Sequence, residues 1–262
     1  MYYYLIINKN NIANCGIGST IKYISRESFE EYEIDLPSLE IQRKIANILS
    51  NIDNQIERNN SIAKRLQVLG NTIYGSYAKT QYKTLNIKKI AEVIWGQCPL
   101  GENILTSPSN VSIPYASGAG DIDDDVLSVI PKGFTDNPLR IAQAKDVCIS
   151  VAGTVGKIGV VTENMAIGRA MLSIRNPDLY GYLYFAMNSY KNVLSKQATG
   201  AIQKIINNTH LETIYIPLEN KTIADVLNDI VDRIIQIEHD TLKLNQLKNK
   251  LLPLLINGQL SV

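Results

Sequence analysis

The residues most suggestive of chemistry form a glycine-rich segment, residues 152–159, which follows an apolar run and contains Lys157. A phosphate-binding Walker loop needs four residues between its glycines, then Lys and Ser or Thr, so that consecutive amides surround the phosphates. Here two residues separate Gly153 from Gly156, and Ile158 follows the lysine. The spacing argues against nucleotide binding. It favours a tight glycine turn between strands, or a turn in which Thr154 and Lys157 contact nucleic acid.

Other candidate catalytic groups do not form complete sets. The acidic run at residues 121–125 lacks EF-hand spacing and a closing glutamate, so we expect a solvated acidic loop. His210 and His239 are 29 positions apart, which argues against a histidine metal centre or a Ser-His-Asp triad. We find no nuclease-type pair of carboxylates with a lysine and no Asn/Asp-Pro-Pro-Tyr/Phe motif. The sequence therefore predicts a recognition or scaffolding protein with no catalytic residues, no metal and no cofactor.

Composition limits the class of protein further. The chain has 262 residues, of which 45% are hydrophobic, enough for a packed core. Its 26 Lys and Arg against 25 Asp and Glu give a net charge of +1, which excludes a polybasic binder. The three cysteines, Cys15, Cys98 and Cys148, are expected to be reduced thiols. With no apolar run long enough to span a bilayer and no signal-peptide pattern, we expect a soluble, cytoplasmic protein that does not associate with membranes.

A long internal repeat is the most informative feature of the sequence. Residues 45–52 (IANILSNI) resemble residues 223–230 (IADVLNDI) at an offset of 178. The similarity extends upstream, where Tyr-Glu-Ile-Asp-Leu-Pro at 32–37 matches Ile-Tyr-Ile-Pro at 214–217, and Tyr-Tyr-Leu at 3–5 matches Tyr-Leu-Tyr at 182–184. Residues 1–80 are thus a second copy of residues 180–262, and the block between them occurs once.

Each copy is predicted to end in a long helix. Apolar residues recur every three or four positions from 41 to 73 and from 223 to 254, a pattern typical of helices that pair as a coiled coil. Each helix would be about 35–40 residues long, close to residues 38–78 and 220–256, and the two would pack on each other.

The ends of these helices have recognisable signals. Ser38 is a plausible N-cap of the first helix, and Asn220 or Thr222 of the second, while Asn-Gly at 257–258 favours a stop. Gly70 and Pro253 lie inside the patterns, where we expect a kink or an early end of each helix.

The central block predicts a mixed α/β module. Short runs of β-forming residues alternate with turn residues at 90–95, 126–130, 146–151 and 158–162. A helix is expected at 180–192, and a last strand at 214–218 leads into the second long helix. The predicted fold class is α/β (α+β), with this module flanked by two long helices that form an antiparallel coiled coil.

Polar side chains able to contact base edges are scattered over this block. Arg and Lys suit guanine, and Asn and Gln suit adenine. The candidates for DNA contact are Gln97, Ser117, Arg140, Thr154, Lys157, Arg169, Gln203, Lys204 and Asn207. From Lys83 to Pro217 there are 12 Lys and Arg against 11 Asp and Glu. Because phosphate neutralisation supplies much of the affinity for duplex DNA, a partner must contribute positive surface if DNA is the ligand.

Several segments, taken in order, resemble the specificity subunits of type I restriction-modification enzymes. These are Gly-Ser-Thr at 18–20 and Gly-Ala-Ile-Gln-Lys at 200–204, the helix entry at 34–45, Ile-Pro-Tyr at 113–115 with Gly-Asp-Ile at 120–122, the glycine turn at 153–159, and the ending at 247–260. The resemblance covers essentially the whole chain. It implies a target recognition domain that reads half of a bipartite DNA site, with helices that set the spacing between halves and dock the modification subunits, which methylate adenine. A separate restriction subunit cleaves DNA.

The chain departs from the usual plan of two complete recognition domains. We expect a C-terminal remnant of a first domain at residues 1–36, a central helix at 37–80, a complete recognition domain at 81–217, and a distal helix at 218–262. A working bipartite reader would then need self-association or pairing with another specificity fragment.

The function expected from the sequence is therefore non-catalytic recognition of a double-stranded DNA half-site, together with modification and restriction subunits. Substitution of Lys157 or Lys204 is expected to weaken binding of the assembled enzyme to DNA. The alternative is a structural coiled-coil adaptor whose globular block binds a protein. The salt dependence of binding distinguishes the two hypotheses, because DNA recognition should weaken steeply as the salt concentration rises.

Overall fold

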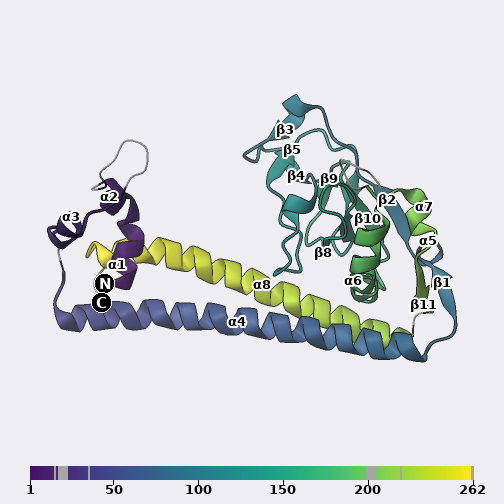
Figure 1. The fold of residues 1–262 in the computed structure, drawn as a ribbon, viewed down its shortest axis with the longest axis horizontal. Helices are drawn as coiled ribbons and strands as arrows, with labels where there is room; N and C mark the ends of the chain where they lie inside the picture. Colours follow the sequence, from purple (N-terminus) through teal and green to yellow (C-terminus); the bar gives the residue numbers. More distant parts are fainter. Residues whose placement is uncertain (15, 17–22, 35, 199–204, 219, 261–262) are drawn as a thin grey trace. The chain divides into compact units, whose positions relative to one another are not determined.

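The computed structural model describes residues 1–262 except 15, 17–22, 35, 199–204, 219 and 261–262. The chain forms two compact units: unit 1 comprises residues 1–60 and 239–262, and unit 2 comprises residues 61–238. Two long helices, α4 (Leu39–Thr80) and α8 (Lys221–Ile256), each contribute to both units (Figure 1). No helix among the described residues is apolar over enough of its length to cross a membrane.

Unit 1 is helical throughout its described elements. It contains α1 (Tyr2–Ile7), α2 (Lys9–Asn14) and α3 (Arg26–Glu30), with the first half of α4 and the last part of α8. Its core consists of Ile45 and Leu49 from α4, and Leu252 and Leu255 from α8, against which Tyr3 and Ile7 of α1 pack. Buried Asn59 of α4 donates to Thr241 Oγ1 of α8 over 3.1 Å. The pairing is antiparallel, and a buried polar pair of this kind favours one register.

Within the described part of the chain, unit 2 contains all the strands, and they form three sheets. A two-stranded sheet pairs β1 (Thr84–Asn86) with β11 (Tyr215–Pro217). An antiparallel four-stranded sheet has the order β2-β10-β7-β8, from β2 (Glu92–Trp95), β10 (Met171–Arg175), β7 (Val147–Ser150) and β8 (Ile158–Val160). The five-stranded sheet has the order β3-β5-β4-β9-β6, from β3 (Ile104–Leu105), β5 (Gly133–Thr135), β4 (Ile113–Ala116), β9 (Met165–Ile167) and β6 (Ile141–Ala142).

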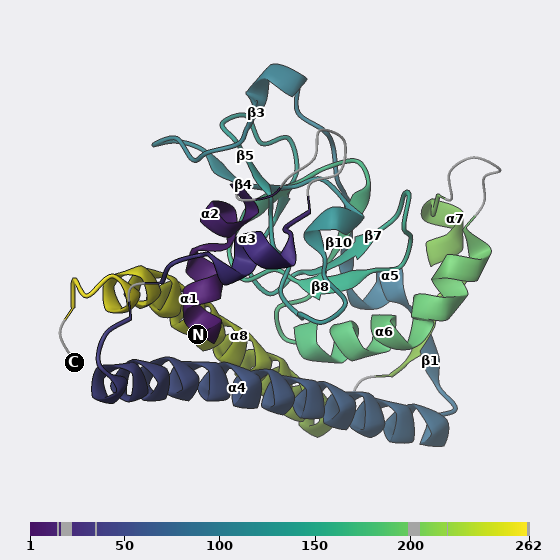
Figure 2. The same ribbon diagram turned by 60° about the vertical axis from the view of Figure 1, so that its left-hand side comes forward.

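Helix α6 (Tyr180–Gln197) lies between the four-stranded sheet and the long helices of unit 2 (Figure 2). One core joins β7 and β10 through α6 to Tyr74 of α4 and Leu227 of α8. A second core, which includes Cys148 and Ile167, lies on the other face of β7 and β10. These central strands are therefore buried on both faces. Shorter helices α5 (Ile87–Ile90), η1 (Gly101–Asn103), η2 (Ala119–Asp121) and α7 (Asn208–Leu211) complete the unit.

The structure confirms both long helices and their caps. Ser38 precedes α4, and its Oγ accepts from the Ile41 amide over 3.5 Å. Asn220 precedes α8, and its Oδ1 accepts from the Ile223 amide over 3.3 Å, so Asn220 rather than Thr222 is the cap. Gly258 has a positive φ of 67° after the last turn of α8, as a C-terminal stop requires.

The early ends expected at Gly70 and Pro253 were wrong, and the kinks offered as the alternative stay predictions. α4 continues through Gly70, because the absence of a side chain there makes room for the buried ring of Phe185 from α6. α8 contains Pro253 and continues to Ile256. The apolar pattern is also only partly buried between the helices, since Ile62, Leu69 and Leu247 are exposed.

The expected strand at residues 126–130 was also wrong. The segment makes only isolated bridges, Ser128 to Val160 and Ile122 to Val129. Its amides at Leu127 and Ser128 donate to the Glu238 carboxylate of α8 over 2.6 and 3.1 Å, so they are not available for a sheet ladder. The strand and helix predictions at 90–95, 146–151, 158–162, 180–192 and 214–218 agree with β2, β7, β8, α6 and β11.

We predict that Gly70→Ala lowers the free energy of unfolding by about 1–3 kcal/mol, because a Cβ there overlaps the Phe185 ring and over-packs the core. Gly75, one and a half turns later in the same helix, is the matched control, since a Cβ there meets no atom within 4 Å. Gly75→Ala should leave stability unchanged or raise it by up to about 1 kcal/mol. Urea denaturation followed by circular dichroism measures both, and equal effects would contradict this packing.

Candidate nucleic-acid interface

The Gly168–Met171 turn, which connects β9 to β10 and so joins the two larger sheets, is the centre of a polar surface on unit 2. The amide of Gly168 donates to Ala116 O over 2.8 Å, and the amide of Val151 donates to Ala170 O over 2.8 Å. Just before the turn, Ile167 O accepts from the Gln97 amide over 2.9 Å, and the Ile167 amide donates to Arg140 O over 3.0 Å. Loops from distant parts of the chain are thus fixed to one short segment.

Four of the predicted contact residues meet around this turn. Gln97, Ser117, Arg140 and Arg169 are all exposed, and each lies in or next to a segment that hydrogen-bonds to residues 167–168. For Gln97 and Arg140 these fixed contacts use the backbone, which leaves their side chains available to a ligand. Sequence spacing gave no indication that these four positions, spread over 73 residues from 97 to 169, share one surface.

Glycine allows the backbones at this surface to approach closely. A Cβ on Gly96 would overlap the carbonyl oxygen of Gly168. A Cβ on Gly168 would lie 2.5 Å from Tyr115 Oη and 2.9 Å from Ser117 O. Any larger residue at either position must therefore displace the loops that carry Gln97 and Ser117.

Asp121 holds the Ser117 loop from beneath. Its Oδ2 accepts from the amides of Ser117 and Gly118 over 2.8 and 3.1 Å, and from Ser117 Oγ over 3.0 Å. Its Oδ1 accepts from the Lys132 amide over 2.9 Å. Asp121 is 3% exposed, so the expectation of a solvated acidic loop was wrong at this residue, although Asp123, Asp124 and Asp125 are exposed. A buried carboxylate suits this position because several backbone donors converge on it.

The glycine turn between β7 and β8 is a tight turn, as one of the two sequence interpretations predicted. Gly153 and Gly156 have positive φ values of 74° and 87°. The Lys157 ammonium donates to Ile122 O over 2.9 Å and lies 3.6 Å from the Asp124 carboxylate. Lys191 of α6 also binds Asp124, and that hydrogen bond, aided by Lys157, lowers the pKa of the Asp124 carboxyl. Lys157 thus has structural partners, whereas Thr154 is exposed.

The remaining predicted contact residues lie beside this turn or outside the described part of the chain. Asn207 caps α7, where its Oδ1 accepts from the Thr209 amide over 3.1 Å. The bridge between Ala152 and Ile205 brings the segment before α7 next to the glycine turn. Gln203 and Lys204 lie outside the described residues.

Sequence reasoning missed two groups at the surface. Lys132 is exposed, and its amide is bound by Asp121, so it adds a cation beside the Ser117 loop. Exposed Cys98 lies next to Gln97, with its Sγ 3.3 Å from Tyr115 Oη. Burial raises the pKa of the Tyr115 hydroxyl, and the contact with Cys98 adds to this, so the hydroxyl stays protonated near neutral pH. Only the fold brings these residues to the turn.

Two carboxylates fix segments that support the surface. Asp146 is 2% exposed and lies 2.9 Å from Arg175 Nη2; this hydrogen bond raises the pKa of the arginine. Ser173 Oγ also donates to Asp146, over 2.7 Å. On α8, Glu238 accepts from two amides of the 127–128 segment, as described above. Removing either carboxylate would leave buried donors unpaired.

Within the described ranges, no group of His, Cys, Asp and Glu is arranged to hold a metal ion. Burial raises the pKa of the Cys148 thiol, which makes it a poor nucleophile. The described surface thus offers exposed hydrogen-bond donors and cations held by a rigid backbone, an arrangement suited to recognition of a polar, anionic ligand such as nucleic acid.

The fold and this surface define a recognition module carried by long paired helices, and comparison with known proteins identifies the family. Residues 1–68 and 79–249 match the model of the type I restriction modification DNA specificity domain. The chain belongs to this family, whose model describes a DNA specificity domain.

Relatives of known name agree with this assignment. The chain is 26% identical over 270 residues to the putative type I restriction enzyme MjaX specificity subunit of Methanocaldococcus jannaschii, covering 91% of this chain and 62% of that protein. It is 26% identical over its whole length to the MjaVIII specificity subunit of the same organism, and covers 70% of it. The chain thus spans about two thirds of the length of these relatives.

A solved structure supports the fold. The S subunit of a type I restriction-modification system from M. genitalium superposes with a TM-score of 0.69 at 18% identity. The match covers 97% of this chain and 71% of that subunit.

We predict that Asp121→Asn lowers the free energy of unfolding of unit 2 by about 1–3 kcal/mol, because the amide cannot accept all the backbone donors that the carboxylate accepts. Asp123→Asn is the matched control. Asp123 is exposed and accepts only locally, from the Asp125 amide, so its substitution should change stability by less than about 0.5 kcal/mol. Hydrogen exchange of the Ser117, Gly118 and Lys132 amides locates the effect; unchanged exchange rates in Asp121→Asn would contradict it.

Proposed function

We propose that residues 81–217 form a target recognition domain that reads one half-site of double-stranded DNA, and that the Gly168–Met171 turn presents the residues that contact it. The observation that carries this proposal is the convergence of Gln97, Ser117, Arg140 and Arg169 on one backbone-fixed turn. Arginine side chains can hydrogen-bond to guanine, glutamine side chains to adenine, and serine hydroxyls to either base. Thr154, Lys157 and Asn207 are proposed as a second set of contacts, on the side of the glycine turn. Gln203 and Lys204, which lie outside the described residues, are also proposed to contact DNA.

The near-zero net charge of the module favours a DNA interface that it shares with a partner protein. Arg140, Arg169 and Lys132 place cations on the surface, but the block from Lys83 to Pro217 has a surplus of only one positive charge. Such a module can position side chains on base edges while a partner supplies most of the phosphate contacts. The modification and restriction subunits of the assembled enzyme are the proposed partners.

The long helices are the proposed docking surface for modification subunits. Leu69 of α4 and Leu247 of α8 occupy equivalent repeat positions, 178 residues apart, and are 48% and 46% exposed. Exposed leucines at matching positions of two repeats suit two copies of the same partner. We further propose that the chain self-associates or pairs with another specificity fragment to form a bipartite reader.

Arg169→Ala tests the DNA interface. In an enzyme assembled with its modification subunits, the substitution should weaken binding to target DNA about tenfold or more, because it removes a base or phosphate contact, and should reduce the slope of log affinity against log salt if the contact is to phosphate. Lys89→Ala, an exposed cation on α5, is the control and should leave both unchanged. Equal affinities of Arg169→Ala and the unsubstituted enzyme at every salt concentration would contradict the proposal.

Leu69→Asp and Leu247→Asp test the docking surface. Each charge would sit in the proposed interface, so each variant should lose about half of the modification subunits in co-purification, and the double variant should lose nearly all of them. Ser76→Asp introduces the same charge at an exposed position of α4 and should retain full assembly. Full assembly of the double variant would exclude these leucines as docking residues.

A further inference from the structure

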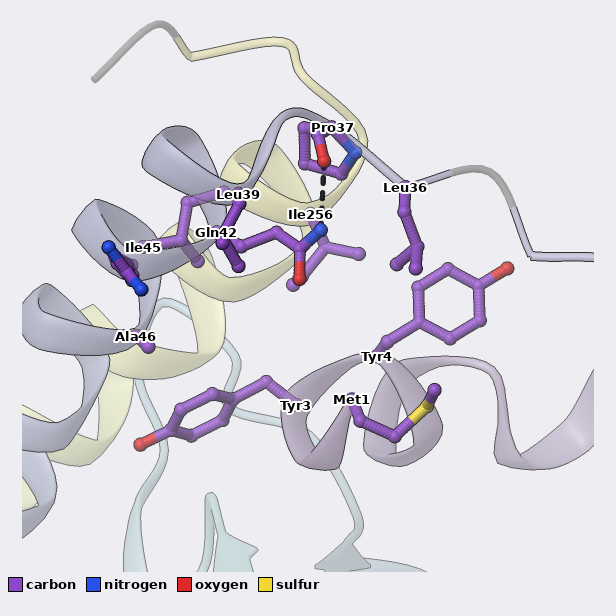
Figure 3. A pocket seen from close by; sticks show the side chains of 11 residues that line it. Met1, Tyr3, Tyr4, Leu36, Pro37, Leu39, Gln42, Ile45, Ala46 and Ile256 are labelled. Atoms are coloured by element: carbon purple, nitrogen blue, oxygen red, sulfur yellow. Dashed lines mark hydrogen bonds between the residues drawn. The ribbon is translucent and has the colours of Figure 1, made fainter.

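A side chain of α8 holds a loop of unit 2 in place. Glu238 Oε1 accepts from the Leu127 amide over 2.6 Å, and its Oε2 accepts from the amide and the hydroxyl of Ser128 over 3.1 and 2.5 Å. A long helix also holds a neighbouring segment in unit 1, where Gln42 Nε2 of α4 donates to Pro37 O over 2.8 Å beside a small pocket (Figure 3). Glu238 differs because one carboxylate accepts three hydrogen bonds, which are strengthened by its charge.

The loop bound in this way, residues 127–132, is fixed along its length, and we call it the linking segment. Leu127 and Val129 are 1% and 2% exposed. The Val129 amide donates to Val160 O over 2.9 Å, and the Val160 amide donates to Leu127 O over 2.8 Å, so the segment lies along the edge of β8. A Cβ on Gly159 would lie 2.9 Å from Val129 Cγ2, so glycine at this position of β8 leaves room for the segment.

The other end of the linking segment is bound to Asp121. The Ile130 amide donates to Asp121 O over 2.8 Å, and the Lys132 amide donates to Asp121 Oδ1 over 2.9 Å. The same carboxylate accepts from the amides of Ser117 and Gly118. The backbone of Lys132 is therefore fixed between the linking segment and the carboxylate that holds the Ser117 loop.

Lys132 is an exposed cation at this end of the linking segment. A Cβ on Gly120 would lie 3.9 Å from Lys132 Nζ, so the ammonium lies beside η2, the turn that follows the Ser117 loop. Several other cations of the same module form ion pairs, namely Lys88, Lys145, Lys157, Arg175 and Lys191. Within the described part of the chain Lys132 forms none, so its charge is available to a ligand.

The Glu238 carboxylate is not part of the repeat. At the offset of 178 residues, the α4 position that corresponds to Glu238 is Asn60, which is exposed. In contrast, the corresponding residues Leu49 and Leu227 are both fully buried. The pairing of the long helices therefore explains the apolar positions that the copies share. It does not explain Glu238, whose three hydrogen bonds go to the module between the copies.

We propose that Lys132 binds a phosphate of the DNA backbone and that Glu238 is a positioning residue, which sets the place of Lys132 through the linking segment. This inference rests on the proposed function, and it adds a contact and its support to the same site. Lysine suits a phosphate because its ammonium is a flexible, strongly hydrated point charge, whereas the planar guanidinium groups of Arg140 and Arg169 suit base edges. A phosphate contact of this kind fixes the register of a protein on the duplex.

Lys132→Ala tests the phosphate contact in the enzyme assembled with its modification subunits. The probe is a duplex that carries the sequence that methylome sequencing shows to be methylated. Loss of one phosphate contact should weaken binding about threefold or more, and should reduce the slope of log affinity against log salt by about 1. Lys132→Arg retains the cation and should keep the slope of the unsubstituted enzyme.

Glu238→Gln tests the positioning role in the full chain without DNA, because the Nε2 of glutamine cannot accept the hydrogen bonds that a carboxylate oxygen accepts. Hydrogen exchange of the Leu127, Ser128 and Lys132 amides should become at least about threefold faster. Asp225→Asn removes an exposed carboxylate from the same helix and is the matched control, which should leave these exchange rates unchanged.

Double variants of the assembled enzyme show whether Glu238 acts through Lys132. Glu238→Gln should weaken DNA binding about threefold or more when it is combined with Arg169→Ala. It should weaken binding by less than about twofold when it is combined with Lys132→Ala, because the contact that it positions is then already absent. A carboxylate that only stabilises the fold would have the same effect in both combinations.

The proposal would be overturned by a salt slope that Lys132→Ala leaves unchanged, by unchanged amide exchange in Glu238→Gln, or by equal effects of Glu238→Gln in the two double variants. Weaker DNA binding by Arg169→Ala together with normal binding by Lys132→Ala would overturn this inference alone. If neither substitution alters binding, both this inference and the proposed DNA interface are wrong.

Discussion

The structure depends on the mutual burial of the apolar faces of α4 and α8. Helices of 42 and 36 residues gain little from propensity alone and need a partner for their apolar faces. In unit 2 the helix pair also buries α6, and α6 in turn supports the four-stranded sheet. Side chains of α8 then fix the loops: Glu238 binds the amides at 127–128, and Asn228 Oδ1 accepts from the Gly181 amide over 2.8 Å. In unit 1 the same pair buries α1 in place of α6.

In the candidate interface, the groups that hold the loops in place are different from the side chains that are proposed to contact DNA. Backbone hydrogen bonds fix the Gly168–Met171 turn and the loops around it, and glycines at 96 and 168 let those backbones meet. The exposed side chains at 97, 140 and 169 take no part in these backbone contacts. Such an arrangement can change its ligand by changing exposed side chains while the supporting framework stays constant, which suits a protein whose family is defined by DNA specificity.

The sequence predicted the features that depend on local pattern and failed where distant contacts decide. The helices and their caps at Ser38 and Asn220 follow from periodicity and local hydrogen bonding, and the glycine turn follows from residue type. No strand forms at 126–130, where the Ser128 amide donates to the Glu238 carboxylate 110 residues away. At Gly70 the ring of Phe185 occupies the space that a side chain would need. Asp121 was misassigned because its donors come from two separate loops. The contact residues were named singly, but only the fold places four of them around one turn.

The central claim, that the module at residues 81–217 determines which DNA sequence is read, is tested most directly by exchanging it. A chimaera would carry residues 1–80 and 218–262 of this chain around the recognition module of another specificity subunit, co-expressed with one modification subunit. Methylome sequencing would then identify the methylated sites. The account predicts that the half-site assigned to this module changes to that of the donor. Methylation of the original, unchanged sequence by an assembled chimaera would contradict it.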